Sequence, residues 1–240
     1  MTLTGAVTAD EAVAPLNSGM RVFVHGAAAT PIPLLEAMVR NTSLRDITLY
    51  HLHTTGPAPF VDPPHRDRFR SVSLFAGPPV RRAIEEGAAD FMPVFLSDIP
   101  LLFLTRKIAL DGALLQLSPP DVHGYCTLGT SVDAALAAAI SAKVIVAEIN
   151  EQMPRTLGNT LVPFSRMAAF AHTNRPLFAH TPRPPTLQMG IGAIPDAALR
   201  RLGHEHELGV HTEMFSEASS TWSKAASSPT GARACTPVAW

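Results

Sequence analysis

The stretch Arg21–Arg40 reads RVFVHGAAATPIPLLEAMVR and predicts the repeating unit of the fold. Its first part, Arg21–His25, is the short apolar run of a strand, and Gly26–Pro31 carries the glycine and proline of a turn. The apolar spacing from Leu34 to Met38 then predicts a helix. A strand, a turn and a helix therefore follow one another in this short segment.

The same order recurs along the chain. Strands alternate with helices of about ten residues, which is typical of crossover connections between parallel strands. We therefore predict an α/β fold with an open, largely parallel sheet flanked by helices. Further strands are expected at 46–51, 71–75, 90–96, 113–117 and 144–148, and further helices at 80–86 and 132–142. The helix at 80–86 has two Arg/Glu pairs spaced four residues apart, and Gly87 provides its stop signal.

Composition and charge exclude several classes of protein. Of the 240 residues, 46% are hydrophobic and 16% are charged, so a filled core is expected and a mainly disordered chain is not. The formal net charge of -1 gives no broad attraction for phosphate backbones or anionic lipid. No apolar run reaches the roughly 18 residues that span a bilayer, and the first residues lack a basic and an apolar signal region. We expect no nucleic-acid or membrane partner and a cytoplasmic location.

Cysteine and histidine positions do not predict a metal site. Cys126 and Cys235 are far apart and form neither a disulfide framework nor a zinc-binding pattern. Cys126, in HGYCTLG, has no evident activating base and is expected to be a buried structural thiol. The histidines of GHEHELGVH do not have the HExxH spacing of a zinc protease, so no metal is predicted. These histidines are His204, His206 and His211.

A proline-rich segment predicts a domain boundary. Residues 173–185 contain four prolines in thirteen positions and no periodicity, which is typical of an interdomain connection. We place the boundary near residue 184. A new α/β unit is then predicted, with a strand at 186–189, a Gly190-Ile-Gly192 turn, a helix through Ala198 to Leu202, and a short strand at 208–211.

Two glycine turns and one carboxylate are candidate functional features. The Gly190–Gly192 turn follows a strand and opens a helix, so it is a tight turn, a phosphate or CoA contact, or part of a nicotinamide site. The turn Gly26–Thr30 lacks the ending of a P-loop and is expected to be a plain turn. Glu213 follows the short strand and is either a surface carboxylate, a general base or a nucleophile toward an activated acyl carbon.

Several of these stretches together resemble the acetyl-CoA hydrolase/transferase family, which belongs to the class I CoA-transferases and includes 4-hydroxybutyrate and succinyl-CoA:acetate CoA-transferases. The resemblance runs in order from about residue 20 to Glu217. It implies a two-domain protein of the CoA-transferase (NagB/RpiA-like) fold with its active site at the domain junction. The matching segments are VRRAIEEGAADFMPVFLSDIP, LLQLSPPDVHGYCTLGTSVDAA, AKVIVAEINEQMPRTLG, TLQMGIGAIPDAAL and LGVHTEMFSE.

The resemblance also implies the roles of individual residues. The family's catalytic glutamate, which becomes a glutamyl-CoA thioester, falls on Glu213. Its CoA-contacting turn falls on Gly190, Ile191, Gly192, Ala193 and Ile194. The implied function is that of an acyl-CoA:carboxylate CoA-transferase of the acetate CoA-transferase or acetyl-CoA hydrolase type. Its substrates would be an acyl-CoA and a small carboxylate such as acetate, with no tightly bound cofactor.

After Glu217 the sequence departs from the family pattern. Arg outnumbers Lys sixteen to three, which suggests a GC-rich gene. Residues 219–230 were back-translated into codons with G or C in most third positions. When these codons are read one base out of frame, they encode VDLVEGGVITN, which resembles the family's continuation. The hypothesis is a frameshift, so that 1–183 forms the first domain, 184–217 begins the second, and 218–240 is an aberrant, disordered tail.

Two other functional hypotheses remain open. The chain is a CoA-transferase fragment, a non-catalytic remnant or binding module of that fold, or a dinucleotide-binding oxidoreductase. An uncovered second-domain sheet would expose apolar surface and promote association, so a homo-oligomer is also among the expectations.

Overall fold

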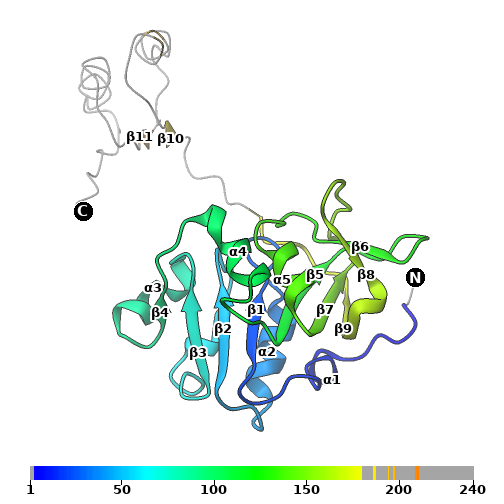
Figure 1. The fold of residues 1–240 in the computed structure, drawn as a ribbon, viewed down its shortest axis with the longest axis horizontal. Helices are drawn as coiled ribbons and strands as arrows, with labels where there is room; N and C mark the ends of the chain where they lie inside the picture. Colours follow the sequence, from blue (N-terminus) through cyan, green and yellow to red (C-terminus); the bar gives the residue numbers. More distant parts are fainter. Residues whose placement is uncertain (1–2, 180–185, 188–193, 195–196, 198–208, 211–240) are drawn as a thin grey trace, which may run out of the picture. The chain divides into compact units, whose positions relative to one another are not determined.

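The computed structural model describes residues 3–179, 186–187, 194, 197 and 209–210 (Figure 1). Contacts divide the chain into two units, Met1–Ala179 and His180–Trp240. The expected boundary near residue 184 and the tail 218–240 lie outside the described residues and stay predictions. Among the described helices, none has the length and apolar character that a membrane crossing needs.

The first unit is built on a seven-stranded sheet in the order β4-β3-β2-β1-β5-β7-β9. Every neighbouring pair in this sheet is parallel. The predicted open, largely parallel α/β sheet is therefore confirmed. In chain order its strands are β1 (Arg21–Val24), β2 (Ile47–His51), β3 (Phe69–Ser73), β4 (Asp90–Phe91), β5 (Gly112–Leu117), β7 (Val144–Asn150) and β9 (Met167–Thr173).

Helices cover both faces of this sheet. Alternate residues of a strand point to opposite faces, so each strand contributes side chains to two cores. In β1, Val22 and Val24 join the core beneath α1, α2 and α3, whereas Phe23 joins the core beneath α4 and α5. Figure 1 shows α4 and α5 in front of the middle strands and α2 behind them. The helices are α1 (Ala9–Ala12), α2 (Ile32–Arg40), α3 (Pro78–Glu85), α4 (Ile99–Leu104) and α5 (Ala135–Ser141), with short 3-10 turns η1 (Pro59–Val61), η2 (Leu96–Asp98) and η3 (Phe164–Arg166).

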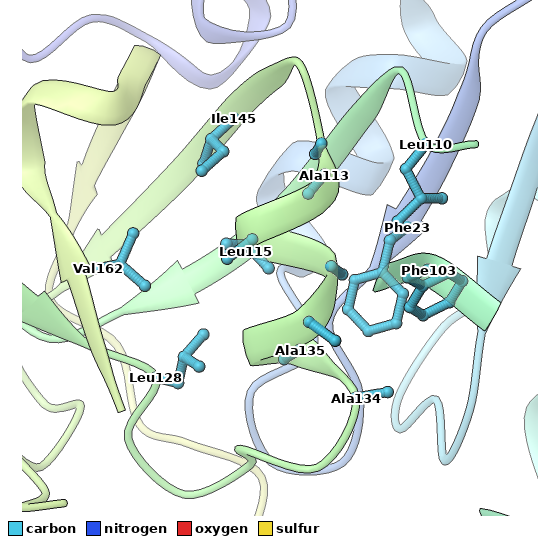
Figure 2. Close-up of a cluster of buried hydrophobic side chains, with 14 of the residues drawn as sticks. Phe23, Phe103, Leu110, Ala113, Leu115, Leu128, Ala134, Ala135, Ile145 and Val162 are labelled. Carbon is cyan, nitrogen blue, oxygen red and sulfur yellow. The ribbon is translucent and has the colours of Figure 1, made fainter. Parts of the chain in front are cut away.

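The core beneath α4 and α5 combines aromatic and small side chains (Figure 2). Phe23 of β1 and Phe103 of α4 meet edge to face, with ring centroids 5.6 Å apart. Ala135 and its alanine neighbours let α5 lie close to the sheet, where Leu115 of β5 and Ile145 of β7 are fully or almost fully buried. Burial on both faces explains why the central strands are almost entirely apolar.

The helices that the apolar periodicity predicts are present. Leu34, Leu35 and Met38 of α2 are fully buried. In α3, Arg82 lies 2.7 Å from Glu86 at the end of the helix, which confirms one of the two expected pairs, and Gly87 adopts a left-handed φ of 71°. That conformation favours glycine and ends the helix.

The structure differs from the prediction at several elements. Strand β4 ends at Phe91 rather than at residue 96, because Pro93 has no N–H to continue the ladder. The apolar residues after it instead form η2 and α4, which the pattern did not predict. The edge strand β9 and a small antiparallel pair, β6 (Tyr125–Thr127) with β8 (Leu161–Pro163), were also not predicted.

Two short strands of the second unit are described. Strand β10 (Thr186–Leu187) pairs in parallel with β11 (Gly209–Val210), with Thr186 opposite Gly209 and Leu187 opposite Val210. The predicted strands at 186–189 and 208–211 are confirmed at these residues.

Substitution of Phe103 tests the core beneath α4. We expect Phe103→Ala to lower the free energy of unfolding by about 3–5 kcal/mol, because it leaves a cavity beside Phe23. The matched control is Leu104→Ala, which removes a 48% exposed side chain on the same helix and is expected to cost less than about 1 kcal/mol. Urea unfolding followed by circular dichroism measures both, and equal losses would contradict this assignment of the core.

Candidate functional site

The carboxyl ends of the parallel strands form the candidate site of the first unit. From β1 the chain first adds β2, β3 and β4 on one side, and then returns to add β5, β7 and β9 on the other. The direction of winding therefore reverses between β1 and β5. In open α/β sheets, ligands bind at the carboxyl edge beside such a switch point.

The turn Gly26–Thr30 after β1 is held by hydrogen bonds within the protein. Gly26 is required, because a Cβ there would clash with the carbonyl oxygen of Leu52. The N–H of Ala27 donates to the His53 carbonyl, and the N–H of Thr30 donates back to the Ala27 carbonyl. Since these donors are already used, the structure supports the plain turn predicted from the sequence rather than a phosphate cradle.

An ion pair with a fully buried carboxylate lies at the carboxyl ends of β7 and β9. Glu148 is fully buried in β7, and both of its carboxylate oxygens accept hydrogen bonds from Arg175, at 2.6 and 2.9 Å. The hydroxyl of Thr173 donates to the same carboxylate at 2.8 Å. The Nη2 atom of Arg175 also donates a 3.0 Å hydrogen bond to the carbonyl of Thr30. One guanidinium thus links β7 to the turn after β1.

Amide side chains extend this network across the switch point. Asn150 donates to the side-chain oxygen of Gln116 at 2.9 Å and to the carbonyl of Arg175 at 2.9 Å. Gln116 in turn donates to the Thr30 carbonyl at 3.2 Å. Asn150 also accepts from the N–H of Arg175 at 3.2 Å and from that of Gln152 at 3.1 Å. The carboxyl ends of β1, β5, β7 and β9 are therefore tied together by polar side chains.

His25 closes the network beside β1. Its Nδ1 accepts from the N–H of Gln116, and its Nε2 lies 2.5 Å from the carbonyl of Ser131, so the proton is assigned to Nε2. Burial lowers the pKa of His25, although its hydrogen bond to the Ser131 carbonyl opposes this shift. The neutral imidazole is therefore favoured, and it joins β5 to the loop that contains Ser131.

His51 occupies a second buried polar position, at the end of β2. Its ring nitrogens lie 2.8 Å from the hydroxyl of Ser71 and 3.0 Å from that of Thr54, and its ring packs against Phe60. Burial lowers the pKa of His51 to about 4. His51 is therefore neutral at physiological pH.

The loop that follows β7 makes polar contacts with the residues on either side of β6. Arg155 in this loop pairs with Asp121 at 2.6 Å and donates to the carbonyl of Tyr125. The Thr156 hydroxyl donates to the Gly129 carbonyl. The loop is thereby fastened to the region around β6.

A shallow depression of about 490 Å³ lies beyond the carboxyl end of β4. It is lined by Pro93, Val94, Phe95 and Asp98.

Cys126 in β6 is a buried thiol, as predicted. Its side chain has no exposed surface, and burial raises its pKa to about 12. Thiolate is the reactive form of cysteine, so Cys126 is not poised as a nucleophile. Within the described ranges, no three His, Cys, Asp or Glu side chains gather as metal ligands would, and the histidines at 204, 206 and 211 lie outside those ranges.

The catalytic and CoA-contacting residues expected from the sequence lie almost entirely outside the described residues. Glu213, Gly190, Ile191, Gly192 and Ala193 are all outside them. Ile194 is described, and its side chain is 84% exposed. The described strands β10 and β11 end three residues before Gly190 and Glu213, respectively.

A comparison with protein families decides the relationship. Residues 5–175 match the model of the acetyl-CoA hydrolase/transferase N-terminal domain. The chain belongs to the acetyl-CoA hydrolase/transferase family. The resemblance stated from the sequence motifs is thereby confirmed, and the match covers the strands and loops that build the network at the carboxyl edge.

Curated relatives of this chain are CoA-transferases about twice its length. It is 44% identical over 235 residues to a succinyl-CoA:acetate/propanoyl-CoA:succinate CoA transferase of Fasciola hepatica, covering 88% of this chain and 49% of that protein. It is 35% identical over 231 residues to a 4-hydroxybutyrate coenzyme A transferase of Clostridium kluyveri, covering 88% and 54%. The chain thus spans about half the length of the curated relatives it matches.

Two solved structures are similar in fold to this chain. RipA from Yersinia pestis matches with a TM-score of 0.68 and 26% identity, over 92% of this chain and 58% of that one. A 4-hydroxybutyrate CoA-transferase from Porphyromonas gingivalis matches with a TM-score of 0.63 and 32% identity, over 92% and 57%. The predicted CoA-transferase fold is therefore confirmed.

The buried imidazole of His51 predicts a loss of stability in mild acid. In the unfolded chain His51 has its ordinary pKa of 6.5, so the unfolded state binds more protons between pH 6.5 and about 4. Stability is full above pH 6.5 and falls as the pH drops to about 4, by about 3 kcal/mol from this residue. Urea unfolding at several pH values measures the loss. His51→Gln should flatten the slope, whereas His123→Gln, at an exposed site, should leave it unchanged; an unaltered slope in His51→Gln would contradict the account.

The burial of Cys126 predicts a protected thiol. In a Cys235→Ser background, we expect iodoacetamide to leave Cys126 unmodified in the native protein and to alkylate it fully in denaturant, because the side chain is buried and its pKa is raised. Intact mass spectrometry measures the modification. Rapid alkylation under native conditions would show that Cys126 is accessible and would contradict its burial.

Proposed function

We propose that this chain is part of an acyl-CoA:carboxylate CoA-transferase of the acetate CoA-transferase or acetyl-CoA hydrolase type. Family membership and the two curated relatives named above support this activity. They also favour CoA over a nicotinamide for the Gly190 turn. The proposed substrates are an acyl-CoA and a small carboxylate such as acetate.

The observation that carries the proposed site is the parallel pairing of β10 with β11. The two partners in each pair are 23 residues apart in the sequence, and Gly190 and Glu213 have the same separation. In the same register, the glycine turn and the carboxylate would follow the carboxyl ends of two neighbouring parallel strands. Ligand sites in α/β sheets form at this edge. We therefore infer that Glu213 and the turn Gly190–Ile194 belong to one site.

The chemistry of a glutamate suits this role. A carboxylic acid with an ordinary pKa of about 4.3 is ionised at neutral pH and is a nucleophile. Glu213 would attack the thioester carbonyl carbon of acyl-CoA and expel CoA as its thiolate, forming an acyl-glutamyl anhydride. The thiolate would then attack the glutamyl carbonyl and expel the acyl group as a carboxylate. The product of this half-reaction is a glutamyl-CoA thioester.

The second half-reaction returns the enzyme to its starting state. An acceptor carboxylate attacks the glutamyl thioester and expels CoA thiolate, which then attacks the acceptor carbonyl of the new anhydride and releases Glu213. Water in place of the acceptor gives hydrolysis. N–H groups at the Gly190 turn would hold CoA, and binding energy from the distant nucleotide end would offset the cost of bringing two anions together.

A second candidate is a non-catalytic remnant of the same fold. The observation that favours it is the length of the chain, which is about half that of its curated relatives. The remnant would bind CoA weakly or not at all and would form no covalent intermediate.

Trapping the glutamyl-CoA thioester separates the two candidates. After incubation of the purified chain with acetyl-CoA, we expect mass spectrometry to find a CoA adduct on the peptide that contains Glu213. Glu217→Gln, four residues away, should retain the adduct, and Glu213→Gln should lose it because an amide is not a competent nucleophile. An adduct in Glu213→Gln would contradict the assigned nucleophile. The absence of any adduct, and of exchange of labelled acetate into acetyl-CoA, would favour the remnant.

A further inference from the structure

The segment that follows β9 turns back across the sheet. Strand β9 lies at one edge of the sheet, whereas the chain that leaves it contacts elements nearer the middle. Figure 1 shows the yellow end of the described chain above the centre of the sheet, with β9 at the right. We define residues 174–178 as the strap, because they run over the carboxyl ends of the strands.

Contacts along the strap follow the order of the strands beneath it. Asn174 accepts from the side chain of Gln152, in the loop after β7, at 2.8 Å. Arg175 is bonded to Glu148 and Asn150 of β7, and it reaches the Thr30 carbonyl after β1. Phe178 lies against Gly56, in the loop after β2, where a Cβ would clash with its ring. The strap thus passes from β9 over β7 and β1 to β2.

One charge pair joins the strap to the buried interior. Glu148 is fully buried, and the side chain of Arg175 is 23% exposed. A buried carboxylate needs a partner, because ionised groups are costly to remove from water. Both oxygens of Glu148 face this guanidinium, and the Arg175 backbone is bonded in both directions to the side chain of Asn150. The rest of the strap has no comparable polar anchor among the described residues.

We propose that Glu148 and Arg175 form a latch that fastens the strap over the switch point and thereby positions the turn Gly26–Thr30. Side chains of Gln116, Asn150 and Arg175 fill the place between β1 and β5 at which an open α/β sheet would offer a crevice. The strap and the turn that it holds therefore cover this edge of the first unit. The latch is independent of the CoA-transferase activity proposed above.

Hydrogen–deuterium exchange on the full chain tests the latch. In Glu148→Gln, the amides of the strap and of Gly26–Thr30 are expected to exchange at least about tenfold faster, because the charge that holds Arg175 is lost. Peptides from β2 and β3 should change by less than about twofold. The matched control is Asp121→Asn, which breaks the 2.6 Å pair with Arg155 in the same unit without touching the strap. It should leave exchange in the strap unchanged.

Two further variants keep the test decisive if Glu148→Gln does not fold. Glu148→Gln combined with Arg175→Met removes both charges, so no buried charge is left unpaired, and it should fold and show the same local opening. Phe178→Ala should speed exchange only beyond Arg175, since the latch remains. The proposal is overturned if the folded double variant keeps wild-type exchange in the strap. It is also overturned if Phe178→Ala releases the Arg175 amide as fully as the loss of the latch does.

Discussion

The parallel pairing of β5 with β1 on one side and β7 on the other is the interaction on which the first unit depends. Every residue of β5 is buried, and its apolar side chains enter the cores on both faces of the sheet. An all-parallel sheet requires such double coverage, because its crossover helices lie on the faces. The two helical layers and the position of the switch point both follow from this pairing.

Polar residues at the carboxyl ends of these strands hold the loops that follow the strands in place. Glu148 and Gln116 stand among apolar residues of β7 and β5, and both are fully buried with their hydrogen bonds made. Removing Arg175 is expected to cost about 3–5 kcal/mol, because the buried charge of Glu148 would be left without its partner. The loops at this edge are therefore held in one arrangement. The family's proposed chemistry is assigned to a different pair of strands, β10 and β11, in the second unit.

Sequence alone was sufficient where the information is local. The strand, turn and helix of Arg21–Arg40 follow from apolar spacing over a few residues, and they were predicted closely. Helix α4 was missed because its residues are apolar without a clear period and follow Pro93. The Glu148–Arg175 network was missed because its members are distant in the sequence and meet only through the strand order. A charged residue inside the apolar strand VIVAEIN was the available signal. Family motifs, rather than spacing, assigned Glu213 and the Gly190 turn, which lie outside the described residues.

The central claim is that the Gly190 turn and Glu213 form one CoA site at the carboxyl ends of β10 and β11. A crystal structure of this chain grown with acetyl-CoA tests it most directly. The account predicts electron density that continues from the CoA sulfur to the Glu213 carboxyl carbon, with the turn Gly190–Ile194 against the CoA. Glu213 and the glycine turn at opposite ends of their strands, or CoA bound away from both, would contradict it.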